Sequence, residues 1–203
     1  MSATLDAFIA GLAATSPLEA ASVFLGLAYS LLAVRRSRWC WVSGGLSSTI
    51  LVYLFARSRL PMQSALQVYY IAMSVYGFRS WARHEKDAGS LVTTWPLRAH
   101  VAAWIGILAL SALSSRWLAA ETGAAWPFLD SMTTWTSLFA TWLVVRMKLE
   151  NWLYWIAIDV ALVYLSGAQK LLFVAFMFAA YLFISAAGFV TWRKAYRLQS
   201  RLS

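Results

Sequence analysis

Long apolar stretches alternate with short polar ones along the chain, in a pattern typical of membrane-spanning helices. The hydrocarbon core of a bilayer, about 30 Å thick, requires about 20 mostly apolar residues per helix. Seven segments meet this requirement, at about residues 17–34, 40–56, 62–82, 98–119, 124–145, 152–168 and 170–191. Because these spans nearly fill the sequence, we expect residues 1–203 to form one transmembrane domain of the all-α class, with no soluble domain beside it.

Composition and charge indicate a membrane protein and give it an orientation. Hydrophobic residues make up 61% of the chain and charged residues 12%, whereas about 25% of an ordinary soluble domain is charged. Of the 17 Lys and Arg residues, 13 fall on one side of the predicted spans. Since cytoplasmic segments are the basic ones, we expect the N-terminus outside and the C-terminus inside. The net charge of +9 is then explained by a lipid bilayer, without a nucleic-acid partner. The first 16 residues lack the basic leader of a signal peptide.

The second half of the chain repeats the first half. Residues 41–81 align without a gap on residues 152–192, and both copies begin with Trp, share Leu-Val-Tyr-Leu and end in Gly-Phe-x-x-Trp. The alternative is that apolar helices share these residues by chance. Three helices on each side of a single linker make the halves parallel, which is a transporter architecture with substrate bound between the halves. The predicted parts are a first bundle at 17–96, a linker helix at 97–120 and a second bundle at 121–203.

Two tryptophans and an aspartate share one face of the sixth predicted span. Trp152, Trp155 and Asp159 stand at i, i+3 and i+7, which places them within about 60° of one another on a helix. A carboxylate in the bilayer costs about 2.5 to 3.5 kcal/mol, so its presence indicates a function. Indole rings and a carboxylate suit a flat organic cation. The alternative is an interfacial tryptophan belt beside an aspartate that hydrogen-bonds a neighbouring helix.

Polar residues of other spans extend this candidate site. Gln67, Tyr70 and Ser74 repeat the same spacing in the third span, and they suit either hydrogen bonds to a substrate or contacts between membrane helices. Ser47 in the second span has the same two interpretations. A polar stripe on the fifth span would be wasteful against lipid, so we expect it to line a cavity. Its members are Asp130, Thr133, Thr134, Ser137 and Thr141.

Catalytic and metal chemistry has little support in the sequence. The single Cys40 excludes an internal disulfide and a thiolate metal site, and we expect it to pack as a small hydrophobe. His84 and His100 fall in or beside a loop that we expect to be solvated. Asp130 and Asp159, the buried ionisable candidates, lie in different spans. We therefore expect no enzymatic activity, no cofactor and no metal.

The chain resembles the PnuC family of bacterial vitamin transporters. The resemblance rests on "LQVYYIAMSVYGFRSW" at 66–81, "FLDS" at 128–131 and "ENWLYWIAIDV" at 150–160. It implies seven helices in a three-one-three, SWEET-like arrangement, commonly as a homotrimer, in the bacterial inner membrane. It also implies facilitated diffusion of an unphosphorylated vitamin, followed by trapping through a cytoplasmic kinase that phosphorylates the substrate.

The substrate implied by the resemblance depends on one departure from the family motif. Nicotinamide riboside carriers of the family have W-x-x-W-x-x-x-N, and here Trp152 and Trp155 match while Asp159 stands in place of the asparagine. Two other family asparagines correspond to Ser47 and Ser74. The family favours nicotinamide riboside, whereas fewer amides and an added negative charge favour thiamine. Both are cations, and riboflavin, the third possibility, is not.

We therefore expect a transporter that alternates access around a site at the midplane of the membrane. Trp152 and Trp155 should sandwich the cation, and Asp159 should balance its charge. Gln67, Tyr70 and Asp130 should orient the substrate. Two alternatives remain, an integral membrane enzyme, which would need a catalytic pair, and a membrane protein that does not transport, such as a scaffold subunit.

Overall fold

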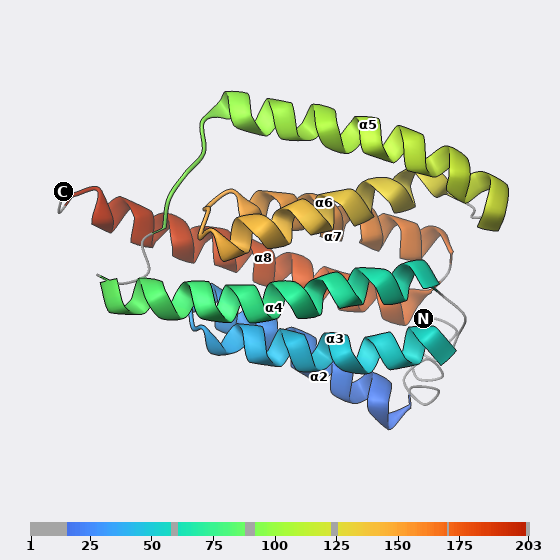
Figure 1. The fold of residues 1–203 in the computed structure, drawn as a ribbon, viewed down its shortest axis with the longest axis horizontal. Coiled ribbons are helices and arrows are strands. Elements are labelled where there is room, and N and C mark those ends of the chain that lie inside the picture. Colours follow the sequence, from blue (N-terminus) through green and yellow to red (C-terminus); the bar gives the residue numbers. More distant parts are fainter. Residues whose placement is uncertain (1–15, 58–60, 88–91, 123–125, 170, 202–203) are drawn as a thin grey trace, which may run out of the picture.

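The computed structural model of the protein describes residues 16–57, 61–87, 92–122, 126–169 and 171–201. Within these ranges the regular structure consists of seven helices (Figure 1) and one isolated β-bridge between Thr93 and Lys148. The helices are α2 (Pro17–Val34), α3 (Trp39–Arg57), α4 (Pro61–Asp87), α5 (Leu97–Thr122), α6 (Pro127–Val145), α7 (Asn151–Ala168) and α8 (Leu172–Gln199). The predicted all-α class and its seven helices are confirmed.

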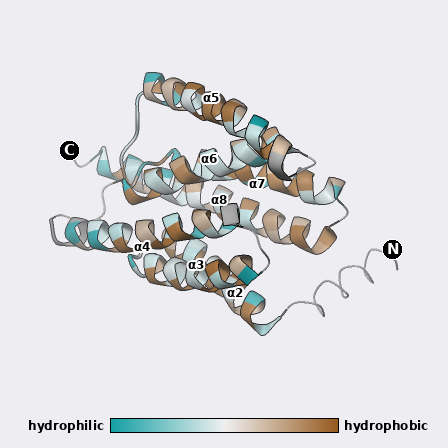
Figure 2. Cartoon of the chain, turned by 45° about the vertical axis from the view of Figure 1, so that its right-hand side comes forward, coloured by the Kyte–Doolittle hydropathy of each residue, from teal (hydrophilic) through white to brown (hydrophobic). Residues whose placement is uncertain are grey.

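Five of these helices, α2, α3, α5, α7 and α8, are long and apolar enough to cross a membrane. The other two are less apolar, and they pack on these helices, α4 on α3 and α6 on α5 and α7. Figure 2 shows hydrophilic residues gathered toward the C-terminal end of α4, and the polar stripe predicted from the sequence lies on α6. Both helices line a cavity inside the protein, where polar side chains do not meet lipid.

Local signals set the ends of the helices. α2 begins with a capping box, in which Glu19 N donates to Ser16 Oγ at 3.3 Å and Ser16 N donates to Glu19 Oε2 at 2.7 Å. α2 occupies the predicted range of 17–34, whereas α4 and α8 continue to Asp87 and Gln199, beyond their predicted ends. Hydropathy detects only the part of a helix that lies in the membrane, and the extensions are polar and basic.

The helices form two groups of three, with α5 on the outside (Figure 1). In the first bundle α3 packs against α2 and α4, and in the second bundle α7 packs against α6 and α8. The bundles meet where α2 contacts α8 and where α4 contacts α6. α5 packs on α6, so the linker helix lies against the second bundle.

Local geometry recurs between the bundles at an offset of 111 residues. Arg36 and Met147, which follow the ends of α2 and α6, both have a positive φ, of 57° and 51°, in a region that few residues other than glycine adopt. The next residues, Ser37 and Lys148, each donate their amide to a carbonyl five residues earlier at 3.0 Å. These recurrences are what the predicted repeat requires. The axis that relates the bundles and the orientation in the membrane stay predictions.

Candidate functional site

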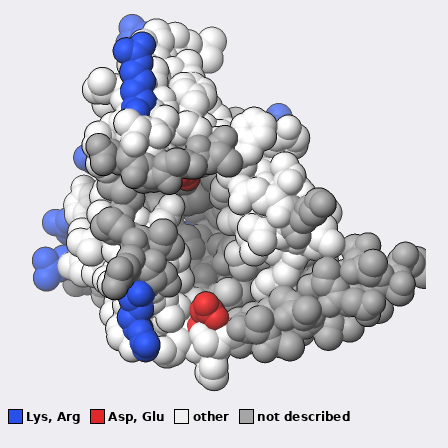
Figure 3. All heavy atoms as spheres, turned by 90° about the vertical axis from the view of Figure 1, so that its right-hand side faces the viewer, with Lys and Arg blue, Asp and Glu red and all other residues white. Residues whose placement is uncertain are grey.

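A cavity of about 520 Å³ lies between the two bundles, lined by α2, α3, α4, α6, α7 and α8. Figure 3 looks onto the end of the molecule at which α2 begins, and this face is hollowed at its centre. The cavity brings together all eight residues that the sequence placed in the site. They are Ser47, Gln67, Tyr70, Ser74, Asp130, Trp152, Trp155 and Asp159.

Four tryptophans close the opposite end of the cavity, near the starts of α3 and α7. Trp41 packs edge-on against Trp81, and Trp152 packs edge-on against Trp192, with ring centroids 5.5 Å apart in both pairs. Trp81 and Trp192 meet at 6.2 Å, across the boundary between the bundles. No more than 3% of any of the four residues is exposed. This cluster, called the tryptophan floor below, separates the cavity from the end that we predict to be cytoplasmic.

Hydrogen bonds of the tryptophan floor tie each bundle to the other. Trp81 Nε1 in the first bundle donates to the carbonyl of Val145 in the second bundle at 3.1 Å. Trp192 Nε1 in the second bundle donates to the carbonyls of Ala33 and Val34 in the first, at 3.1 and 3.2 Å. Each indole therefore caps the last turn of a helix in the opposite bundle, where helical carbonyls lack a partner within the helix.

Asp159 is buried in the wall of the cavity and has a partner that the sequence analysis missed. The residue is 4% exposed, and Ser185 Oγ on α8 donates to its Oδ2 at 2.9 Å. Ser185 lies 111 residues after Ser74, a predicted site residue, so the repeat was the signal that could have found it. Trp155, one turn from Asp159, is partly buried and also lines the cavity.

The two tryptophans of α7 are not equivalent in the structure. Trp152 lies on the backbone of Gly188, where an added Cβ would come within 2.6 Å of the indole ring. One face of Trp152 is therefore occupied by α8, and its edge contact with Trp192 makes it part of the floor. Among the described glycines none lies against Trp155, which is partly buried and lines the cavity, and its stacking role stays a prediction.

The first bundle supplies polar groups on the other side of the cavity. Gln67 and Ser74 are both 8% exposed. Ser47 Oγ donates to the carbonyl of Ser22 on α2 at 2.8 Å, so its proton serves contact between helices while the residue still lines the cavity. From the second bundle, Tyr181 on α8 reaches across to α2, and the sequence analysis missed this residue also. A Cβ on Gly26 of α2 would lie 2.7 Å from the hydroxyl oxygen of Tyr181.

A family comparison identifies the kind of protein to which this cavity belongs. The model of the family described as nicotinamide mononucleotide transporter matches residues 16–194. The chain belongs to this family. The predicted resemblance to PnuC is thereby confirmed, and the protein is a multi-pass membrane transporter of that family, not an enzyme.

Relatives of the protein within this family are named as transporters of different vitamins. It is 26% identical over 144 residues to the nicotinamide riboside transporter PnuC of Neisseria mucosa, covering 64% of this chain and 54% of that protein. It is 28% identical over 185 residues to the riboflavin/roseoflavin transporter RibM of Streptomyces davaonensis, covering 87% and 84%. Identity to PnuC of Escherichia coli is 24% over 175 residues, covering 73% of each.

A solved structure agrees with the fold of the family member. The crystal structure of the vitamin B3 transporter PnuC superposes with a TM-score of 0.74, covering 96% of this chain and 90% of that one. Sequence identity in this comparison is 18%. The comparison therefore establishes a shared helical architecture.

Among the Asp, Glu, Lys, Arg and His side chains of the described residues, only acidic ones line the transporter's cavity. Asp130 and Asp159 contribute carboxylates to its wall, and no Lys, Arg or His is found among the described residues that line it. Acidic residues are visible in and beside the hollow of Figure 3, while Lys and Arg lie toward the edges of that face. A cavity with low-dielectric walls concentrates the field of such carboxylates when they are ionised, and this field favours cations over anions.

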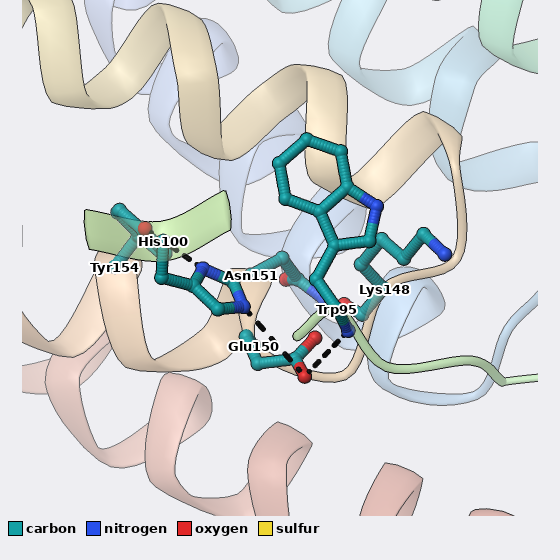
Figure 4. Close-up of polar contacts among 6 residues, drawn as sticks. All are labelled: Trp95, His100, Lys148, Glu150, Asn151 and Tyr154. Carbon is teal, nitrogen blue, oxygen red and sulfur yellow. Dashed lines mark hydrogen bonds and ion pairs between the residues drawn. The ribbon is translucent and has the colours of Figure 1, made fainter. Parts of the chain in front are cut away.

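His100 does not lie in a solvated loop, and that prediction was wrong. It belongs to the first turns of α5 and contacts the start of α7 (Figure 4). Its Nδ1 is 3.0 Å from the hydroxyl oxygen of Tyr154, and its Nε2 is 3.8 Å from Glu150 Oε1. The same Glu150 oxygen accepts a hydrogen bond from Trp95 N at 2.9 Å. This cluster joins the linker helix to the second bundle, away from the cavity. The side chain of His84 lies outside the described residues.

Proposed function

We propose that this protein carries a small, unphosphorylated, cationic vitamin across the bacterial inner membrane, and that the vitamin is nicotinamide riboside. The observation that carries the proposal is the pairing of Asp159 with Trp155 in the wall of a cavity between two bundles. A ring cation in this position stacks on an indole and faces a carboxylate, and a cation–π contact contributes about 0.5 to 2 kcal/mol. The names of two relatives support the choice of vitamin.

Thiamine is the second candidate substrate. It is also a ring cation, and Asp159 gives it a full counter-charge where the resembling nicotinamide riboside carriers have a neutral asparagine. Ser47 and Ser74 replace two further asparagines, which leaves fewer amides for the hydroxyls of a ribose. Riboflavin, which appears in the name of one relative, has no positive charge for Asp159 to balance and ranks third.

The absence of basic residues from the described cavity wall supports a substrate without phosphate. A phosphate charge about 7 Å from a carboxylate is repelled by about 2 kcal/mol at an effective dielectric constant of 20. Asp130 and Asp159 would each oppose it, and the described wall offers no Lys or Arg to compensate. Nicotinamide mononucleotide, the compound in the description of the family, is therefore a poorer fit than its nucleoside.

Transport proceeds by alternating access between the two bundles. The cavity faces the predicted external end, while the tryptophan floor closes the other end through the cross-bundle bonds of Trp81 and Trp192. Rocking the bundles apart at the floor breaks these bonds and releases the vitamin into the cytoplasm. Movement is by facilitated diffusion. A cytoplasmic kinase that phosphorylates the released vitamin and a homotrimeric assembly, both implied by the resemblance, complete the proposal.

The proposal is tested by uptake into liposomes that contain the purified protein. Labelled nicotinamide riboside, thiamine and riboflavin are compared, and we expect saturable uptake of nicotinamide riboside without ATP or an ion gradient. Asp159→Ala should abolish this uptake while the purified protein remains folded. Trp117→Ala is the matched control for handling of the variants, because Trp117 lies 53% exposed on α5, away from the cavity. Saturable uptake of none of the three vitamins would refute the function, and normal uptake by Asp159→Ala would refute the role of the carboxylate.

A further inference from the structure

Equivalent positions of the two bundles face the same cavity but carry different chemistry. At the offset of 111 residues, Asp159 corresponds to Ser48 and Trp155 corresponds to Gly44, and all four residues line the cavity. Charge and indole ring are therefore found together on the second bundle, whereas the matching positions of the first bundle carry a hydroxyl and no side chain. The wall of the cavity is asymmetric although local geometry recurs between the bundles.

The hydroxyl at the third matching position is retained in both bundles. Ser74 in α4 and Ser185 in α8 correspond at the same offset, and they are 8% and 6% exposed. In the second bundle this hydroxyl donates to Asp159 Oδ2 at 2.9 Å, in a buried contact between α7 and α8. When Asp159 is ionised this hydrogen bond is charge-assisted, and such bonds are stronger than those between neutral groups. Ser185 thus anchors Oδ2 from α8, and among the described residues no other hydrogen bond to the Asp159 side chain is found.

We propose that Ser185 is a positioning residue of the site and that the substrate binds in one orientation. Its cationic ring lies against Trp155 and Asp159 of the second bundle, and its hydroxyl-bearing part lies against Ser48 and Ser74 of the first. Ser185 acts through Asp159, by aiming Oδ1 at the cation. The site thus selects planar ring cations with a hydroxylated substituent. This inference rests on the proposed function and specifies how the same cavity recognises its ligand.

Charge discrimination is the readout that separates positioning from a merely structural role. Tryptophan quenching gives the dissociation constant of nicotinamide riboside and of its uncharged dihydro form, which has the same ribose. Thiamine and its uncharged analogue, with carbon in place of the thiazolium nitrogen, form a second pair. The measured quantity is the ratio of dissociation constants, uncharged to charged. We expect Ser185→Ala to lower this ratio about tenfold, since hydrogen bonds to charged groups have effects of that size.

Two further variants complete the test of positioning. Ser185→Thr keeps the hydroxyl and should retain most of the ratio. Ser115→Ala, which removes a hydroxyl bonded only to its own helix on α5, is the control for serine removal away from the cavity. If Ser185→Ala weakens charged and uncharged ligands equally, Ser185 is structural and the positioning role is overturned.

Moving the carboxylate tests the orientation. Asp159→Ser abolishes binding of the cation if the proposed function holds. The double variant Asp159→Ser with Ser48→Asp restores the charge of the cavity at the matching position, away from Trp155. We expect cation binding to stay lost, because ring and carboxylate are then on opposite bundles. Recovery of binding would overturn the orientation and leave only a general negative potential. Failure of the unaltered protein to bind any of these vitamins would instead refute the proposed function.

Discussion

Removing the indole N–H groups of the tryptophan floor should open the end of the cavity that we predict to be cytoplasmic. In Trp81→Phe and Trp192→Phe an aromatic ring remains in each position while the donor to the opposite bundle is lost. The bonds removed are 3.1 Å long and buried. A hydrogen bond of this kind contributes about 0.5 to 1.5 kcal/mol net. In the double variant, the free energy that favours the closed floor over the open floor therefore falls by about 1 to 3 kcal/mol. This change multiplies the ratio of open to closed protein by about 5 to 150.

The chain carries its own reporter for this opening. Cys40, its single cysteine, is 0% exposed and packs in the same cluster as all four floor tryptophans. A maleimide reagent reaches the thiol only when the packing around it separates. The rate of Cys40 modification in liposomes should therefore rise in the order wild type, single variant, double variant. Trp117→Phe on the exposed face of α5 is the matched control and should leave the rate unchanged.

Two results would refute the reasoning about the floor. The first is an unchanged rate of Cys40 modification in a double variant that elutes as a folded protein, since the cross-bundle bonds would then contribute nothing to closure. The second is a faster rate of Cys40 modification accompanied by a lower unfolding temperature of the whole protein. Destabilisation of the whole fold would then explain the labelling. Measurement of thermal unfolding on the same samples separates opening of the floor from global destabilisation.

Other substitutions test the wall of the cavity and its packing. Trp155→Ala should weaken binding of the aromatic cation by about 1 to 3 kcal/mol through loss of ring contact, and an unchanged dissociation constant in a fluorescence titration would remove Trp155 from the site. Gly188→Ala should lower the free energy of unfolding by about 1 to 3 kcal/mol through overpacking, because its Cβ would meet the ring of Trp152 at 2.6 Å. Gly106→Ala is the matched control in the unfolding measurement, since no atom beyond its chain neighbours and the backbone of its own helix lies within 4 Å of its Cβ position.

The pattern of apolar and polar residues was sufficient for the architecture and much of the cavity wall. The first span was predicted at 17–34, and α2 occupies that range. Polar side chains within spans also had to avoid lipid, which is why the stripe that begins at Asp130 was correctly expected to line a cavity. Periodicity gives the face of a helix on which a residue lies. Because lipid surrounds a bundle of membrane-spanning helices, the polar face of each helix points inward.

What the pattern could not supply was contact between particular helices. Ser185 looked like one serine in an apolar span, and its bond to Asp159 depends on how α8 packs against α7. His100 was expected near water because a polar loop precedes it in the sequence, yet Tyr154 and Glu150 of a distant segment contact it. In both cases the partner lies on another helix, and the periodicity within one helix carries no signal for such a contact; for Ser185 only the correspondence with Ser74 in the repeat pointed to the site.

The floor of the cavity is alike in the two bundles, whereas the wall of the cavity differs between them. A transporter that rocks two similar bundles needs similar contacts at the floor, and Trp81 and Trp192 each cap a helix of the opposite bundle. Recognition of an asymmetric ligand needs the opposite, because a symmetric wall would accept the ligand in two orientations. Trp155 and Asp159 break the symmetry in the wall, while the floor keeps it. In the mechanism that we propose, the same repeat thus serves movement at one depth of the membrane and selectivity at another.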